Sequence, residues 1–128
     1  MQYSKLTFAF VCLFLVVACG AGHPTIQSLQ ISPASASAQS PQGEVGFTAR
    51  AMFSDGNSRE LSVADNLQWL SSDMNVADID KNTGQATCKA PGTVTITASA
   101  PANLTITVNN GVNNTSQKVT STAQLICM

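Results

Sequence analysis

The chain has 128 residues, with six Lys and Arg against seven Asp and Glu, which leaves a net charge of −1. This length fits one domain with one core, and the balanced charge gives no basic stripe for nucleic acid and no acidic tail, which excludes nucleic acid as a partner. Aromatic residues make up only 5%, whereas Thr, Ser, Ala, Val and Ile are plentiful, which favours many short strands.

Residues 1–18 are predicted to form a signal peptide. Lys5 places a positive charge before the apolar run from Leu6 to Val17. The run has about a dozen residues, whereas a helix that crosses a hydrocarbon core of roughly 30 Å needs about 20. It therefore reads as an export segment and not as a membrane span.

The leader ends in Val16-Val17-Ala18-Cys19, which resembles the lipobox of bacterial lipoproteins. The resemblance implies that Cys19 receives a diacylglyceryl group and becomes the first residue of the mature protein, followed by a lipidated tether over residues 19–25. Two or three acyl chains give stable membrane attachment, whereas one is marginal. Gly20 follows Cys19 where an Asp would signal inner-membrane retention, so the resemblance implies the outer membrane of a host that has one.

The same leader allows a second interpretation, an ordinary signal peptide that is cut near Ala18 or Ala21. Cys19 is then lost or left as a free thiol. The protein would in that case be periplasmic or secreted and not anchored by lipid.

The first strand is expected from Ile26 to Ser32, with Leu29 and Ile31 on one face. Pro33 ends it, because proline lacks the backbone N–H that a strand ladder needs. The following residues, 34–43, carry little apolar bulk and read as a loop or an irregular edge.

A second strand is expected from Val45 to Phe53, where apolar and polar residues alternate with a period of two. This period is typical of a strand with one buried face. The turn residues of 54–57 end it. Residues 59–65 are expected to form a weak strand or loop that carries Leu61 and Val63 inward.

The stretch from Leu67 to Ala98 is expected to contain three further strands. A polar corner at 71–75 and a tight turn at 80–84 lie between the Trp-bearing strand and the Cys-bearing strand, and a Pro-Gly turn at 91–92 leads to an alternating Val/Ile strand. The residues expected to face inward are Leu67, Trp69, Val76, Ala77, Ile79, Ala86, Cys88, Ala90, Val94, Ile96 and Ala98.

The residues of this stretch are Trp69-x-Ser71-Ser72-Asp73, Val76-Ala77-x-Ile79-Asp80, Gly84 and Pro91-Gly92-Thr93-Val94-Thr95-Ile96-Thr97-Ala98. Their order resembles the group 2 bacterial immunoglobulin-like domain, which is repeated in intimin- and invasin-type surface proteins. The resemblance implies an all-β fold, an Ig-like β-sandwich of seven to eight short antiparallel strands over residues 26–128. It covers residues 26–108 well and the last strand loosely.

The chain continues beyond the usual end of this pattern. Residues 104–108 alternate, Asn109-Asn110-Gly111 is a strong turn signal, and a last strand is expected from Gln117 to Cys127. The final hairpin is therefore expected to be longer than in the resembled family.

The expected core consists of the large apolar residues that face inward by parity. A Trp on a central sandwich strand is usually the plug between the two sheets. The core residues expected on these grounds are Trp69, Phe47, Phe53, Ile79, Val94 and Ile96.

Four cysteines are present, of which Cys12 leaves with the leader and Cys19 is assigned to lipid. Cys88 and Cys127 both face inward by parity, and an exported protein enters an oxidising compartment, which predicts a disulfide between them. The alternative is a pair of buried free thiols.

Oxygen-bearing side chains at Asp73, Asp78, Asp80 and Asn82 are of the type that binds calcium. Their spacing departs from the EF-hand loop, which needs glycine at its sixth position, where this chain has Thr83. A turn opened by Asp80 explains the same residues without a metal. We therefore expect no metal or other cofactor and keep calcium as the minor interpretation.

The sequence contains no recognisable catalytic group, since His23, the only His, has no acid or nucleophile beside it. The leading hypothesis is a non-enzymatic, lipid-anchored exported module for adhesion, envelope binding or scaffolding, with an unknown protein or glycan partner.

Two other classes of function remain open. A carbohydrate-binding module would need exposed aromatic rings, although Phe47, Phe53 and Trp69 face inward by parity. An assembly subunit would pair through an edge strand, for which residues 104–108 and 117–127 are the candidates.

Overall fold

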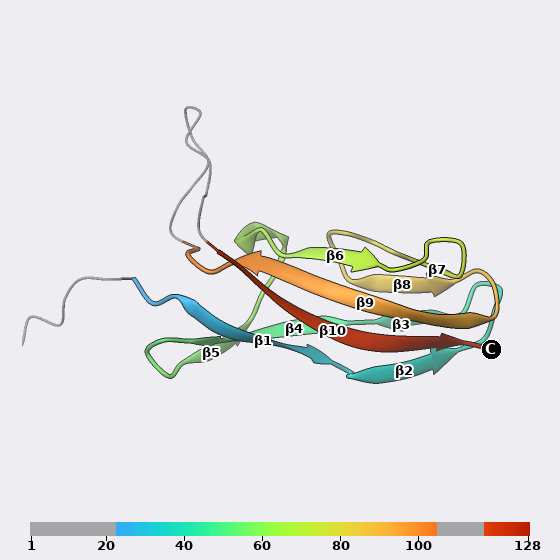
Figure 1. Cartoon of the computed structure of the whole chain (residues 1–128), viewed down its shortest axis with the longest axis horizontal. Coiled ribbons are helices and arrows are strands. Elements are labelled where there is room, and N and C mark those ends of the chain that lie inside the picture. Colours follow the sequence, from blue (N-terminus) through green and yellow to red (C-terminus); the bar gives the residue numbers. More distant parts are fainter. Residues whose placement is uncertain (1–22, 105–116) are drawn as a thin grey trace, which may run out of the picture.

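A computed structural model describes residues 23–104 and 117–128. Within these ranges the chain forms short strands and one 3-10 helix, η1 (Figure 1). In chain order they are β1 (Ile26–Ser32), β2 (Ser35–Ala38), β3 (Glu44–Gly46), β4 (Thr48–Phe53), β5 (Ser58–Glu60), η1 (Val63–Asp65), β6 (Gln68–Ser71), β7 (Ala77–Ile79), β8 (Gln85–Cys88), β9 (Gly92–Pro101) and β10 (Lys118–Cys127).

The strands form two layers. In the first layer β3 and β4 follow each other with only Phe47 between them; β4 pairs with β1 and β5, and β3 pairs with β8, which pairs with β7. The second layer has the order β2-β10-β9-β6. Strands β1, β3–β4, β8 and β7 thus oppose β6, β9 and β10, which is the layering of an immunoglobulin-type sandwich. The predicted all-β, Ig-like sandwich is confirmed, but the described residues form ten strands and not the seven to eight that were expected.

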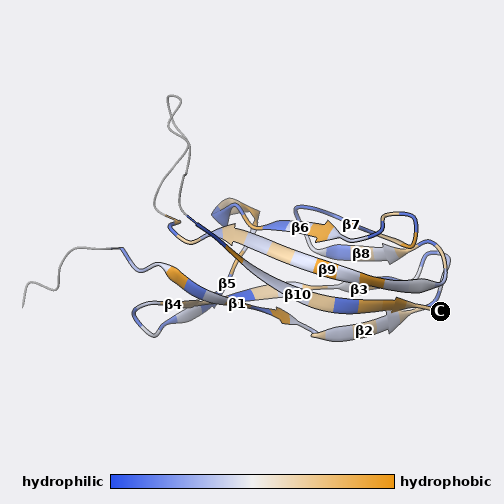
Figure 2. Cartoon of the chain, viewed as in Figure 1, coloured by the Kyte–Doolittle hydropathy of each residue, from blue (hydrophilic) through white to orange (hydrophobic). Residues whose placement is uncertain are grey.

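Side chains alternate between the core and solvent along the long strands, as the pleat of a strand requires. In β9, Val94, Ile96 and Ala98 are buried, whereas the threonines between them face outward. Figure 2 shows the same alternation as changes of hydropathy along β9 and β10. The period-two pattern therefore assigned the faces of these strands correctly.

The prediction of a loop or irregular edge over residues 34–43 missed a regular strand in its first part, β2, although β2 does lie at an edge of the second layer. This strand runs parallel to residues 124–127 of β10, so the strands are not all antiparallel. Gln124 N–H donates to the Ala34 carbonyl at 3.0 Å, and Met128 N–H donates to the Ala38 carbonyl at 2.9 Å. Serine and alanine give β2 no hydrophobic period, so only its pairing with β10 reveals it.

The prediction that Val63 faces inward is also wrong, because Val63 lies in η1 and is 52% exposed. Ser62 caps this helical turn through its hydroxyl, and the Asp65 carboxylate accepts the Ser62 N–H at 3.0 Å. The reciprocal cap favours a helical turn over an extended strand. Leu61, the other residue of this prediction, is buried as expected.

The core lies between the two layers and matches the expected set with one exception. Five of the six expected core residues are buried; they are Trp69, Phe47, Phe53, Val94 and Ile96. Ile79 is only half-buried and packs against the core from its margin in β7. Much of the remaining core is alanine, which allows the layers to approach closely.

The two ends of the sandwich differ. At one end, called the tether end, Ser54 N–H donates to the Thr25 carbonyl at 2.8 Å and Ile26 N–H donates to the Ala102 carbonyl at 2.8 Å. At the other, called the far end, Ser40 N–H donates to the Met128 carbonyl at 2.8 Å. Figure 1 shows these ends at opposite extremes of the long axis.

Candidate functional site

Cys88 and Cys127 form a disulfide that joins the two layers at the far end. Cys88 ends β8 and Cys127 ends β10, and both side chains are buried with their Cα atoms 5.6 Å apart. The predicted bridge is confirmed in preference to two free thiols. It joins β8 of the first layer to β10 of the second layer, and not the pair of strands that carries the usual bridge of antibody domains.

The structure places two of the four calcium candidates, Asp78 and Asp80, in the lining of one pocket with Gln85 and Thr87, but it does not bring all four together. The Asp73 carboxylate accepts the Asn75 N–H at 2.9 Å, and the Asp78 carboxylate accepts the N–H of Ile79 at 2.8 Å. Within residues 23–104 and 117–128 there is no group of three or more His, Cys, Asp or Glu side chains that could hold a metal ion.

Asp80 organises the tight turn between β7 and β8. Its Oδ1 atom accepts the N–H of Asn82 at 2.8 Å and the N–H of Thr83 at 3.1 Å. These backbone donors hold the pKa of the Asp80 carboxyl below its ordinary value, because they stabilise the ionised form. Asp80 and Asn82 are thus part of a turn, as predicted.

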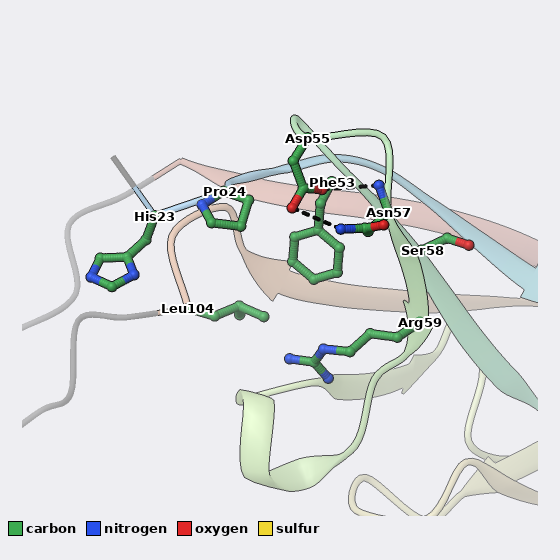
Figure 3. Close-up of a pocket in the computed structure, with 8 residues that line it drawn as sticks. All are labelled: His23, Pro24, Phe53, Asp55, Asn57, Ser58, Arg59 and Leu104. Atoms are coloured by element: carbon green, nitrogen blue, oxygen red, sulfur yellow. Dashed lines mark hydrogen bonds between the residues drawn. The ribbon is translucent and has the colours of Figure 1, made fainter. Parts of the chain in front are cut away.

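A pocket of about 380 Å³ opens at the tether end (Figure 3), and we call it the tether-end pocket. Its lining comes from the first described residues, from the β4–β5 turn with β5, and from the segment after β9. The lining residues are His23, Pro24, Phe53, Asp55, Asn57, Ser58, Arg59 and Leu104. The Phe53 ring lies in the middle of this group.

The charged groups of the tether-end pocket are engaged with neighbouring side chains. The two carboxylate oxygens of Asp55 accept the backbone N–H and the side-chain Nδ2 of Asn57, at 2.9 and 3.0 Å. The Arg59 guanidinium lies 5.4 Å from the centre of the Phe53 ring. It also donates to both carboxylate oxygens of Asp65, at 2.8 and 3.0 Å.

The hydrogen bond from Arg59 is the main cause that lowers the pKa of the Asp65 carboxyl. The same hydrogen bond raises the pKa of the Arg59 guanidinium. Both groups are therefore charged at neutral pH, and they hold η1 against β5. The sequence contains no signal for the tether-end pocket, because the residues that line it belong to segments far apart in the chain.

The aromatic candidates for sugar stacking are all buried. Trp69 is 5% exposed, Phe47 is 2% exposed, and their ring centroids lie 6.5 Å apart. Phe53 is the third aromatic residue of the described ranges, and it is 8% exposed. Each of the three therefore belongs to the core.

The two candidate edge strands have different outcomes. Residues 105–108 lie outside the described residues, so this candidate stays a prediction. β10, the other candidate, is an inner strand of its layer: it pairs with β9 over its whole length and with β2 over residues 124–127. The prediction that this last strand is an edge is therefore wrong over residues 124–127.

Cys19 and the leader, residues 1–18, also lie outside the described residues, as do residues 19–22 of the tether. Of the residues that the structure does describe, none belongs to a helix that is long and apolar enough to span a membrane. A scan of the chain against models of known protein families finds no match, and a search of curated proteins finds no similar chain.

Proposed function

We propose that this protein is a lipid-anchored binding module of the bacterial cell envelope, with an Ig-like domain of the group 2 bacterial kind. It is held by a diacylglyceryl group on Cys19, acts without catalysis, and serves adhesion, envelope binding or scaffolding. The observation that carries this proposal is the entry of the chain at the tether end, opposite the disulfide-bonded far end (Figure 1).

The covalent distance between lipid and domain is short. Three residues separate Cys19 from His23, where the described chain begins. A chain spans at most about 3.3–3.6 Å per residue, so the tether end lies within about 15 Å of the lipidated residue. The outer membrane is the proposed location in a host that has one, since Gly20, and not the Asp of a retention signal, follows Cys19.

This geometry directs the far end away from the lipid. The far end consists of the connections at 39–43, 72–76 and 89–91, which the bridge between Cys88 and Cys127 holds together. Gln42 N–H donates to the Cys88 carbonyl at 2.8 Å, and Lys89 N–H donates to the Val76 carbonyl at 2.7 Å. These cross-links hold the far end of the sandwich together.

The carbohydrate-binding alternative has less support. Stacking on a sugar needs an exposed aromatic face, and within the described ranges Phe47, Phe53 and Trp69 are all in the core. A protein partner is therefore the better supported class.

The test is the mass of the N-terminal peptide after expression in a bacterial host that processes lipoproteins. We expect a diacylglyceryl mass on Cys19 and membrane association of the wild type, and a soluble product from Cys19→Ser. Cys12→Ser in the leader is the matched control and should leave the lipid in place. An unmodified or missing Cys19 in the wild type would mean a periplasmic or secreted domain.

A further inference from the structure

Strand β6 forms one edge of the second layer, since it pairs with β9 on one side only (Figure 1). Ser72 N–H donates to the Thr95 carbonyl at 3.0 Å, in the same register as the β6–β9 ladder. Alternate residues of a strand direct their backbone groups to the same side. Gln68 and Leu70 therefore bond to β9, whereas the N–H and C=O groups of Trp69 and Ser71 point away from it.

These backbone groups form the open edge of β6. No backbone hydrogen bond joins the N–H or C=O groups of Trp69 or Ser71 to another described segment. They lie two residues apart, which is the repeat that a further extended strand would match. The backbone of another extended strand carries the C=O and N–H groups that can pair with them.

A cavity of about 140 Å³, which we call the edge cavity, lies beside this open edge. Half of its described lining residues are apolar and buried, namely Phe47, Ala49, Leu61, Leu67 and Trp69, and the other half are polar, namely Thr48, Glu60, Ser62, Asn82 and Thr83. Within the described residues its lining includes none from β9, so the cavity lies on the open side of β6. A cavity of similar size in another protein accepts benzene, so this one has room for one apolar side chain.

The edge lacks the features by which sheets usually protect an open strand. β6 carries no charge and no proline, and Leu70 on its outer face is 64% exposed. By contrast, β5 carries Arg59 and Glu60, and β2 lies between Pro33 and Pro41. Charges and prolines on an edge discourage pairing, so β6 is more receptive to a further strand than β5 or β2.

We propose that β6 binds an extended peptide of a partner protein by strand addition, with one aliphatic side chain of the peptide in the edge cavity. The residue opposite Trp69 in the added strand directs its side chain to the same face as the indole, and hence into the cavity. The next residue of the peptide lies on the outer face beside Leu70.

A second copy of the chain fits this site less well. In a symmetric β6–β6 pair the inward residues of the added strand would be Trp69 and Ser71 of the other copy. Both are buried in their own core, at 5% and 7% exposed. Such a pair would join the backbones but leave both cavities without a side chain, whereas an unfolded segment satisfies both features.

The inference names the partner class of the proposed binding module and rests on that binding role, but not on the lipid. The probe is a set of peptides of sequence Lys-Thr-Gln-Thr-Xaa-Thr-Gln-Thr-Lys, in which Xaa is Ala, Val, Leu or Asp. They are titrated into the full chain in detergent micelles while the emission of Trp69, the only tryptophan, is recorded. We expect the Leu peptide to bind about tenfold or more tightly than the Ala peptide and the Asp peptide not to bind.

Amide hydrogen exchange, followed by NMR, separates strand addition from other modes of binding. The Leu peptide should slow exchange at Trp69 and Ser71 and leave the β9-bonded amides of Gln68 and Leu70 unchanged. Cys19→Ser should bind the peptides as the wild type does, so a failure of lipidation and a failure of this site are distinguishable.

Two pairs of variants locate the site. Asn82→Phe places a large ring at an exposed position that lines the cavity and leaves Trp69 the only tryptophan, whereas Lys81→Phe changes the same turn away from the cavity. Leu70→Glu changes the outer face of β6, whereas Ile126→Glu changes the same face on β10. We expect about tenfold weaker binding from the first member of each pair and little change from the second.

Three results would overturn the proposal. One is that no peptide of the set saturates the protein up to about 1 mM, the weak limit of specific binding. Another is that all the peptides bind with equal affinity, which would mean that no side chain enters the cavity. The third is concentration-dependent self-association that Leu70→Glu abolishes, which would assign the edge to a second copy.

Discussion

Gly84 lies under the indole ring of Trp69, at the point where the β7–β8 turn enters β8. Its φ angle is +75°, a left-handed conformation that side chains rarely adopt. A Cβ atom there would lie 2.9 Å from Cε2 of Trp69 and 2.5 Å from the Phe47 carbonyl oxygen. Backbone conformation and space both require glycine, which links the turn to the packing of the core.

Gly84→Ala is expected to lower the free energy of unfolding by about 2–4 kcal/mol, because left-handed strain adds to overpacking. Gly56→Ala is the matched control: Gly56 has φ +85°, and nothing lies within 4 Å of its Cβ position. Gly56→Ala should lower the free energy of unfolding by only about 1 kcal/mol. Urea unfolding followed by Trp69 fluorescence measures both, and equal losses would show that the contact with Trp69 has no effect.

Arg59 and Asp65 form the best-defined ion pair of the described residues, with two hydrogen bonds and a backbone bond from Ser62 to the same carboxylate. The side chain of Arg59 is 52% exposed and that of Asp65 is 17% exposed. Solvent therefore screens the pair, and its contribution to stability is about 1 kcal/mol or less.

The pair makes stability depend on pH in acid. The pKa of Asp65 is lower in the folded state than its ordinary value, so the folded state favours the ionised carboxylate. The stabilisation is complete above an unfolded pKa of about 3.9 and is lost as the pH falls through the lower folded pKa. The free energy of unfolding of Asp65→Asn should accordingly decline less steeply below about pH 4 than that of the wild type.

Glu60→Gln is the control for this prediction, since it removes a neighbouring exposed carboxylate that has no ion pair among the described residues. The free energy of unfolding of Glu60→Gln should fall below about pH 4 as steeply as that of the wild type. If Asp65→Asn and the wild type lose stability in parallel between about pH 4 and pH 2, the ion pair does not stabilise the fold.

At the scale of elements, β10 shows why an edge cannot be recognised from an alternating pattern. Its inward residues Ala123, Leu125 and Cys127 have the parity that the sequence predicts. The pattern nevertheless contains no information on how many neighbours a strand has. β2, which carries only Ser and Ala, supplies the second neighbour, and β6 remains the open edge of the layer.

The disulfide joins two elements, β8 and β10, that belong to different layers. The sequence separation is 39 residues, for which the chain-entropy model gives about 4 kcal/mol of stabilisation. The double variant Cys88→Ala with Cys127→Ala should lose up to about this amount and unfold at lower urea concentration.

Alkylation followed by intact mass checks the bridge directly. In the unreduced native protein neither Cys88 nor Cys127 should react, and both should react after reduction and unfolding. A reductant should also destabilise the wild type and leave the double variant unchanged. Two thiols that are freely alkylated before reduction would contradict the bridge.

On the scale of the whole molecule, the point where the described chain begins and the disulfide lie at opposite ends of one elongated sandwich. The open edge of β6 runs along its side, between these ends. Under the proposed anchoring, a peptide added to β6 therefore lies beside the domain and does not have to pass between the domain and the lipid. Anchoring and binding thus use separate parts of the molecule.

The sequence predicted those features that depend on neighbours along the chain. The period of two from Val45 to Phe53 indicates one buried face because successive side chains of a strand point to opposite sides. The parity of Cys88 and Cys127 predicts the bridge for the same reason, and Asp80 with Gly84 predicts a tight turn through local backbone bonds.

Tertiary structure decided the features that depend on contacts between distant segments. The pairing of β2 with β10, the open edge at Trp69 and the edge cavity all require the layers to be assembled, since their parts come from segments far apart in the chain. Val63 was predicted wrongly because the reciprocal cap of Ser62 and Asp65 competes with strand parity. By itself the sequence determined the faces of the main strands and the cysteine pair, because alternation is local, whereas strand neighbours, edges and cavities exist only after the chain has folded.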